Sequence, residues 1–104
     1  MRRPQLLPAT ISLKRGINTL GRKSDNSKSN TQLPTTDPFM SKNHASIDVI
    51  YKEKTSTFEH ILSDSHSKNG TFHYEQRLEA GDTILLLKDD EIRLGHTVFK
   101  IVTE

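Results

Sequence analysis

The sequence contains no cysteine and no apolar run long enough to cross a membrane. Without cysteine the chain can form neither disulfide bonds nor cysteine-ligated zinc, which favours a reducing compartment, the cytoplasm or the nucleus. Only two leucines precede Pro8 in the basic N-terminal segment, too few for a signal peptide. We therefore expect residues 1–104 to form one small domain without a membrane partner, as the N-terminal part of a longer protein.

Aromatic residues are scarce, and the charged residues are mixed in sign. The chain has four phenylalanines, two tyrosines and no tryptophan, and its 15 lysines and arginines are interleaved with 13 acidic residues. Proteins that bind nucleic acids usually concentrate basic residues beside stacking aromatic side chains. The formal charge of +2 therefore predicts a weak preference for anionic partners and no direct binding of nucleic acids.

The sequence also lacks the usual signs of catalysis and of metal binding. Its five histidines show no spacing that would pair two metal ligands, so we expect no metal and no cofactor. Ser41 and His44 lie three residues apart, and on an extended strand this odd spacing sends the two side chains to opposite faces. Nothing marks a nucleophile elbow or an oxyanion hole, so the sequence predicts no catalytic residue and no enzyme.

What the sequence does contain is a series of short alternating or β-branched segments between turn signals, with no apolar 3.6-residue period. This pattern predicts an all-β fold, a sandwich of two twisted, mainly antiparallel sheets with binding loops gathered at one end. The expected strands cover residues 5–13, 18–21, 45–51, 57–62, 71–73, 83–87, 91–94 and 97–102.

Two segments carry further expectations. Residues 23–40 are polar with almost nothing apolar to bury, which predicts a long surface loop, with a very short strand beginning at Leu33 as an alternative. Residues 84–87 read "ILLL", which favours a buried strand, although an exposed apolar patch there would support a dimer.

Three polar clusters lie at expected strand ends. Gly21-Arg22 follows one strand, "SKNHA" at 41–45 opens the next, and "SKNGT" at 67–71 contains Asn69-Gly70, a strong turn signal. Loops at one end of a sandwich lie close together, so these clusters are expected to converge. The guanidinium, hydroxyl, ammonium, amide and backbone N–H groups of such a patch would suit a tetrahedral dianion such as phosphate.

Taken together, "GR", the pattern Ser41, His44 and Ala45, and "SKNGT" resemble the forkhead-associated (FHA) domain, a β-sandwich that binds phosphothreonine. The resemblance covers nearly the whole chain, because "DDEIRLGHTVFKI" at 89–101 is similar to the last two strands of that family. It implies that Arg22 and Ser41 contact the phosphate.

The same resemblance assigns roles to the neighbouring residues. Lys42, which stands where the family often has arginine, and Lys68 are further phosphate contacts, and Asn69 would hydrogen-bond the peptide main chain. Together with Arg22 and Ser41 they form the predicted phosphopeptide site. Loop architecture is expected of Gly21, His44, Gly70 and Thr71.

The function implied is recognition of a phosphothreonine-containing protein or peptide, in nuclear DNA-damage or cell-cycle signalling. Some N-terminal FHA domains of DNA-damage mediator proteins resemble this chain in placement and are thought to dimerise. A homodimerisation or scaffolding module, in which phosphate binding is weak or lost, is therefore the alternative hypothesis.

Overall fold

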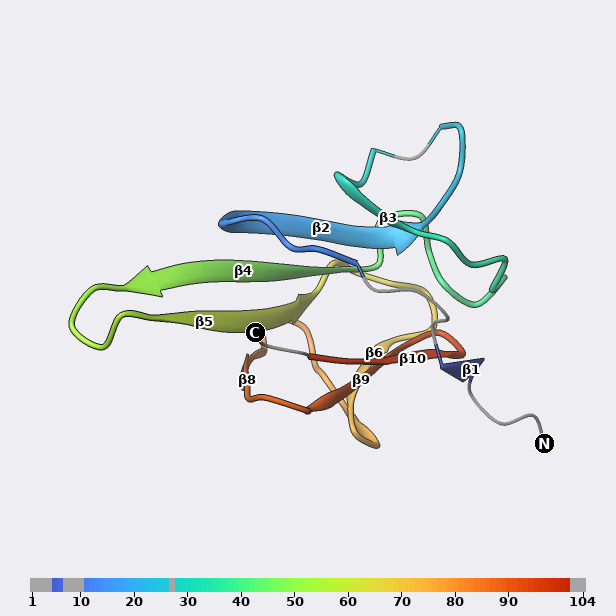
Figure 1. The fold of residues 1–104 in the computed structure, drawn as a ribbon. Coiled ribbons are helices and arrows are strands. Elements are labelled where there is room, and N and C mark those ends of the chain that lie inside the picture. The colour runs from blue at the N-terminus through green and yellow to red at the C-terminus, as the bar shows by residue number, and fades with distance from the viewer. Residues whose placement is uncertain (1–4, 7–10, 27, 102–104) are drawn as a thin grey trace.

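The computed structural model describes residues 5–6, 11–26 and 28–101, which fold as two five-stranded sheets packed face to face (Figure 1). One sheet has the order β1 (Gln5–Leu6), β10 (Thr97–Lys100), β9 (Glu91–Leu94), β6 (Thr71–His73) and β7 (Gln76–Arg77). The other has the order β3 (Thr31–Leu33), β2 (Gly16–Arg22), β4 (Ala45–Lys52), β5 (Thr57–Asp64) and β8 (Thr83–Leu86). This architecture confirms the predicted all-β sandwich, which is mainly antiparallel with parallel pairs at β1–β10 and β2–β3.

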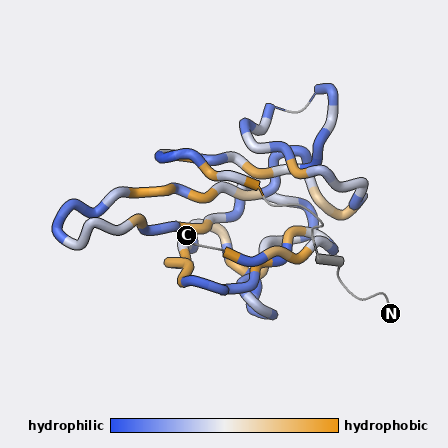
Figure 2. The backbone as a smooth tube through the Cα atoms, in the orientation of Figure 1, coloured by the Kyte–Doolittle hydropathy of each residue, from blue (hydrophilic) through white to orange (hydrophobic). Residues whose placement is uncertain are grey.

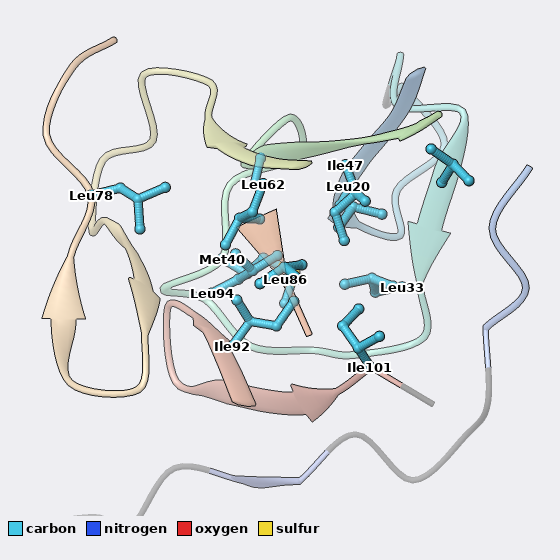
Figure 3. Packing of buried hydrophobic residues seen from close by; sticks show 12 residues of the cluster. Leu20, Leu33, Met40, Ile47, Leu62, Leu78, Leu86, Ile92, Leu94 and Ile101 are labelled. Carbon is cyan, nitrogen blue, oxygen red and sulfur yellow. The ribbon is translucent and has the colours of Figure 1, made fainter. Parts of the chain in front are cut away.

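Period-two alternation explains which side chains fill the space between the sheets. In β4 the side chains of Ala45, Ile47 and Val49 are buried, whereas those between them face outward. Figure 3 shows the buried leucines and isoleucines of the two sheets pointing toward one another. Figure 2 shows that the β4–β5 turn and the segment after β2, which lie outside this core, are hydrophilic.

Three strand predictions need correction. Strand β1 covers only Gln5–Leu6 of the expected segment 5–13; residues 11–13 lie outside any strand, and residues 7–10 are outside the described part of the chain. Strand β7 was not in the predicted set, and β3 had been considered only as a very short strand beginning at Leu33. Segment 23–40 is therefore a loop interrupted by β3, which pairs in parallel with β2 and ends at the buried Leu33 rather than beginning there.

The expectation that residues 84–87 are buried holds only in part. Leu86 is buried, but Leu85 and Leu87 are 48% and 63% exposed. The reason is that alternate side chains of β8 face away from the other sheet, which points Leu85 outward, and Leu87 follows the end of the strand.

Candidate functional site

The three polar clusters meet at the end of the sandwich where β2 finishes, opposite the β4–β5 turn (Figure 1). The backbone N–H of Arg22 donates to the Ser41 carbonyl at 3.1 Å. The Lys68 N–H lies 3.4 Å from the Ser41 hydroxyl oxygen. Ser41 thus lies between the end of β2 and the turn at 67–70, and the predicted convergence of the clusters is confirmed.

Arg22 presents its guanidinium in a fixed orientation. Its Nε–H donates to the Met40 carbonyl at 3.1 Å, which leaves the outer N–H groups for a ligand. Within the described ranges, no carboxylate oxygen lies within 4.0 Å of this guanidinium. A half-buried arginine held at one nitrogen and lacking a carboxylate suits an incoming anion.

Gly21 is required by a close approach of two backbones. A Cβ atom on this residue would lie 1.7 Å from the carbonyl oxygen of Lys42. That oxygen also accepts a hydrogen bond from the Ser29 hydroxyl at 2.5 Å. No side chain therefore fits at position 21, and the absence of one lets segment 41–44 lie directly against β2.

His44 joins two loops from inside the protein: segment 37–44, which carries Ser41, and segment 64–71, which carries Asn69. We call these the first and second recognition loops. Its side chain is fully buried, and its Nδ1 accepts the Ser41 backbone N–H at 2.9 Å. Because Nδ1 is an acceptor, the neutral ring carries its hydrogen on Nε2, which donates to the Gly70 carbonyl at 2.7 Å. Burial lowers the pKa of His44, although the bond to Gly70 and nearby carboxylates oppose the shift. The Ser41 hydroxyl plays no part in these bonds, so the pair is not a nucleophile and its base.

Asp64 organises the second recognition loop, and sequence reasoning missed it. Its carboxylate accepts the Ser67 N–H at 3.0 Å, the Ser67 hydroxyl at 2.5 Å and the Thr71 hydroxyl at 2.6 Å. Burial opposes ionisation of Asp64, but these hydrogen bonds together outweigh it and lower its pKa. The signal available was the Asp-x-x-Ser spacing before the Asn-Gly turn, which is typical of a local side-chain turn.

Within the same loop, the Ser67 hydroxyl connects the Asp64 carboxylate to the backbone of the turn. Its hydroxyl oxygen accepts the Gly70 N–H at 3.0 Å, and Gly70 adopts φ +91°, a conformation that favours glycine. Thr71 is buried, and its hydroxyl donates to the Asp64 carboxylate at 2.6 Å.

Asn69 lies at the surface of the turn and bonds to the opposite loop. Its side-chain N–H donates to the Phe39 carbonyl at 3.0 Å, which leaves its carbonyl oxygen and second hydrogen for a ligand. Phe39 in turn stacks on His96, with ring centroids 4.2 Å apart. The Asp37 carboxylate accepts N–H groups from Phe39 and His96, so segment 37–41 is held against the β9–β10 turn. Asp37 was also missed by sequence reasoning.

The two predicted lysine contacts differ in this structure. The Lys42 ammonium donates to the Asn26 side-chain oxygen at 2.6 Å and so lies against the segment after β2. Lys68 is exposed and contributes its backbone N–H to the Ser41 hydroxyl. The structure brings all five predicted binding residues to one end of the sandwich, and their contacts with a peptide stay predictions.

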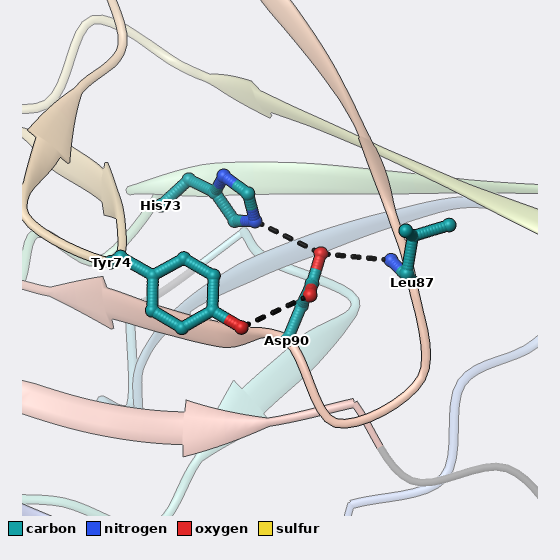
Figure 4. A network of polar contacts seen from close by, with 4 residues as sticks. All are labelled: His73, Tyr74, Leu87 and Asp90. Carbon is teal, nitrogen blue, oxygen red and sulfur yellow. Dashed lines mark hydrogen bonds and ion pairs between the residues drawn. The ribbon is translucent and has the colours of Figure 1, made fainter.

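A second polar cluster lies outside this site, between the β6–β7 and β8–β9 turns (Figure 4). The Asp90 carboxylate accepts hydrogen bonds from His73 at 2.9 Å, from the Tyr74 hydroxyl at 3.2 Å and from the Leu87 N–H at 2.9 Å. The Leu87 bond and the His73 bond lower the pKa of Asp90. All three partners hold turns together, and the cluster contains no serine or threonine nucleophile.

The described residues contain no group of three or more histidine, cysteine, aspartate or glutamate side chains placed to hold a metal ion. No helix in the described ranges is long and apolar enough to span a membrane.

Comparison with known proteins matches the FHA domain model to residues 18–95. The comparison with curated proteins found no match. Among solved structures, an FHA domain from a structural and functional analysis of phosphothreonine-dependent interactions is 27% identical, with TM-score 0.66, covering 88% of this chain and 81% of its own.

Two further solved structures are similar. The FhaA FHA domain complexed with the intracellular domain of Rv3910 is 29% identical, with TM-score 0.60, covering 82% of this chain and 78% of its own. The MEK1 FHA domain, in complex with a phosphothreonine peptide of HOP1, is 23% identical, with TM-score 0.68, covering 88% of this chain and 85% of its own. The family match spans most of the described sandwich and includes Arg22, Ser41 and Asn69. The chain belongs to the FHA domain family, and it is an interaction module rather than an enzyme.

Proposed function

We propose that this FHA domain binds a phosphothreonine-containing segment of a partner protein. The observation that carries the proposal is the grouping of the Arg22 guanidinium, the Ser41 hydroxyl and the Lys68 N–H at one end of the sandwich. In the described part of the chain, neither Arg22 nor Lys68 has a carboxylate within 4.0 Å, so their charges have no internal partner. A phosphate would supply up to two negative charges and three acceptor oxygens to these donors.

Binding of this kind is a switch controlled by the partner. The unphosphorylated threonine offers one neutral hydroxyl, which cannot neutralise the positive charge of Arg22. Phosphorylation supplies the charge, and charge-assisted hydrogen bonds from arginine are roughly twice as strong as neutral ones. The MEK1 domain, with its phosphothreonine peptide, and the phosphothreonine-dependent interactions of the 27% identical domain support this proposal.

The test is calorimetric titration with a degenerate phosphothreonine peptide pool and its unphosphorylated twin. We expect binding of the phosphorylated pool alone. Lys54→Ala serves as the control, because Lys54 is exposed in the β4–β5 turn at the opposite end of the sheet (Figure 1). Equal binding of both pools, or binding of neither, would contradict the proposal.

A second candidate function is homodimerisation through the outer face of the sheet that contains β8. Ile17, Leu85 and Leu87 are 65%, 48% and 63% exposed, and the register places Ile17, Asp48, Ile61 and Leu85 in one row across that face. Light scattering distinguishes the two candidates: a dimeric mass without phosphopeptide binding would favour scaffolding.

A role in nuclear DNA-damage or cell-cycle signalling is a further proposal, which imaging of the tagged full-length protein before and after damage would test.

A further inference from the structure

A row of basic and aromatic side chains crosses the outer face of the other sheet. In its ladder, Phe72 of β6 pairs with Arg77 of β7 on one side and with Arg93 of β9 on the other. Directly opposed residues of neighbouring strands point to the same face, so both arginines flank the phenylalanine ring. The neighbouring residue in β9, Ile92, is buried, which identifies the Phe72 side as the outer one.

Arg93 is held in place by the row. Its guanidinium carbon lies 3.9 Å from the centroid of the Phe72 ring, and Nη1 donates to the Gly95 carbonyl at 2.6 Å. Stacking and one hydrogen bond orient the planar group and leave its other N–H groups available. The side chain is therefore ready to bind an anion without first being ordered.

Arg77 continues the row toward the recognition loop. A Cβ atom on Gly70 would lie 2.8 Å from Arg77 Nε and 3.1 Å from its Cζ, so the guanidinium covers Gly70, the neighbour of Asn69. Arg77 is exposed and has neither a hydrogen bond nor an ion pair with any described residue.

The two arginines also lack a compensating charge. The ion pairs of the described residues are Lys52–Glu59 and His73–Asp90, so neither arginine has a carboxylate partner. Their strands lie two spacings apart, roughly 10 Å at the usual strand separation. Two like charges at this distance repel each other weakly, and an anion between or beside them would relieve the repulsion.

We propose that Arg77 and Arg93 form a second binding surface, which takes carboxylate side chains of the phosphorylated partner next to its phosphothreonine. The inference rests on the proposed function, because the phosphate site places the peptide beside Asn69. An extended peptide advances about 3.3 Å per residue, so acidic residues within roughly four positions of the phosphothreonine can reach the row. Segments rich in Asp and Glu are thus the class of partner that the surface fits.

The experiment compares two phosphothreonine peptide pools, one with Asp and Glu and one with Ser and Gln at the four positions on either side. The wild-type domain should bind the acidic pool roughly threefold to tenfold more tightly, the range expected for one or two exposed ion pairs. This preference should shrink as salt is raised from low to physiological concentration. Arg77→Gln should remove most of it, lowering affinity for the acidic pool more than for the neutral pool.

Arg93→Lys is the second variant, since lysine keeps the charge but loses the planar group that stacks and bonds to Gly95. It should weaken the preference less than Arg77→Gln. Lys54→Gln, at the far end of the molecule, is the matched charge-removing control and should leave both affinities unchanged. Thermal unfolding of each variant checks that the fold is retained.

The outcomes separate the two proposals. Equal wild-type affinity for the two pools, or a preference that survives Arg77→Gln, overturns the second surface and leaves the phosphothreonine site standing. Binding of neither pool overturns the proposed function, and the second surface falls with it.

Discussion

The Nε2 atom of His44 lies 2.7 Å from the carbonyl oxygen of Gly70, while the other nitrogen of the ring holds the Ser41 N–H. A single buried imidazole therefore connects the loop that carries the phosphate-binding serine to the loop that carries Asn69. Both bonds require the neutral ring, with its hydrogen on Nε2.

Stability should fall in mild acid because of His44. Its pKa is lowered in the folded state, so the unfolded chain binds the proton more readily than the folded one. The stabilising contribution is complete above the unfolded pKa of about 6.5 and is lost as pH decreases toward the lower folded pKa. Denaturant unfolding between pH 8 and pH 5 measures this loss.

His44→Gln should flatten this pH dependence while lowering stability at pH 8 by roughly 1–3 kcal/mol, the penalty for unsatisfied buried groups. His66→Gln is the control, because His66 is exposed and should leave the profile unchanged. A steep acid-dependent loss in His44→Gln that matches the wild type would exclude His44 as its source.

Arg22→Ala should weaken phosphopeptide binding by roughly 2–5 kcal/mol, the range for removing one side of a hydrogen-bonded charge pair at an interface. Arg22→Lys should recover only part of that loss, since an ammonium lacks the two-pronged geometry of the guanidinium. Titration calorimetry with the phosphorylated pool measures both. An unchanged affinity in Arg22→Ala would rule out the site.

Ser41→Ala should weaken phosphopeptide binding by about 1–3 kcal/mol. The fold should stay intact, because within the protein the hydroxyl accepts only a long bond of 3.4 Å from the Lys68 N–H. The contacts that hold segment 41–44 use the backbone N–H and carbonyl of Ser41, and the substitution retains both. The variant should therefore lose affinity for the phosphorylated pool while its unfolding midpoint stays the same. A variant that loses stability as much as binding would argue for a purely architectural serine.

Asp64→Asn should destabilise the turn at 67–70, because the amide cannot accept all the bonds that the carboxylate accepts from Ser67 and Thr71. We expect a loss of roughly 1–3 kcal/mol. In the wild type the pKa of Asp64 is lowered, so its stabilisation is present above the unfolded pKa of about 3.9 and disappears as pH falls through the folded pKa. Asp25→Asn, on the exposed segment after β2, should leave acid stability unchanged.

The sequence was informative where local chemistry decides the structure. The Asn69-Gly70 turn and the alternation in β4 each follow from properties of a few adjacent residues. The position of the three polar clusters at strand ends of a sandwich then predicted that Arg22, Ser41 and Asn69 meet at one end, where the structure has them.

What the sequence left hidden depends on contacts between distant segments. Strand β3 has three residues and one buried apolar side chain, and it exists because it pairs with β2. Leu85 was expected in the core, but Leu86 faces inward and the alternation along β8 therefore points Leu85 to the outer face of the sheet. The roles of Asp37 and Arg77 also arise from partners that only the folded chain brings near them. Asp64 differs, because its partners Ser67 and Thr71 are close in the sequence.

The bond from Asn69 to the Phe39 carbonyl has a kinetic consequence. Together with His44, it ties the recognition loops to each other before any ligand arrives, so a peptide meets a preorganised surface and little entropy is lost in ordering loops. Encounter is then governed by diffusion and by the positive charge at that end of the molecule. Association rates should therefore fall as salt rises, while dissociation rates respond mainly to loss of the Arg22 and Ser41 contacts.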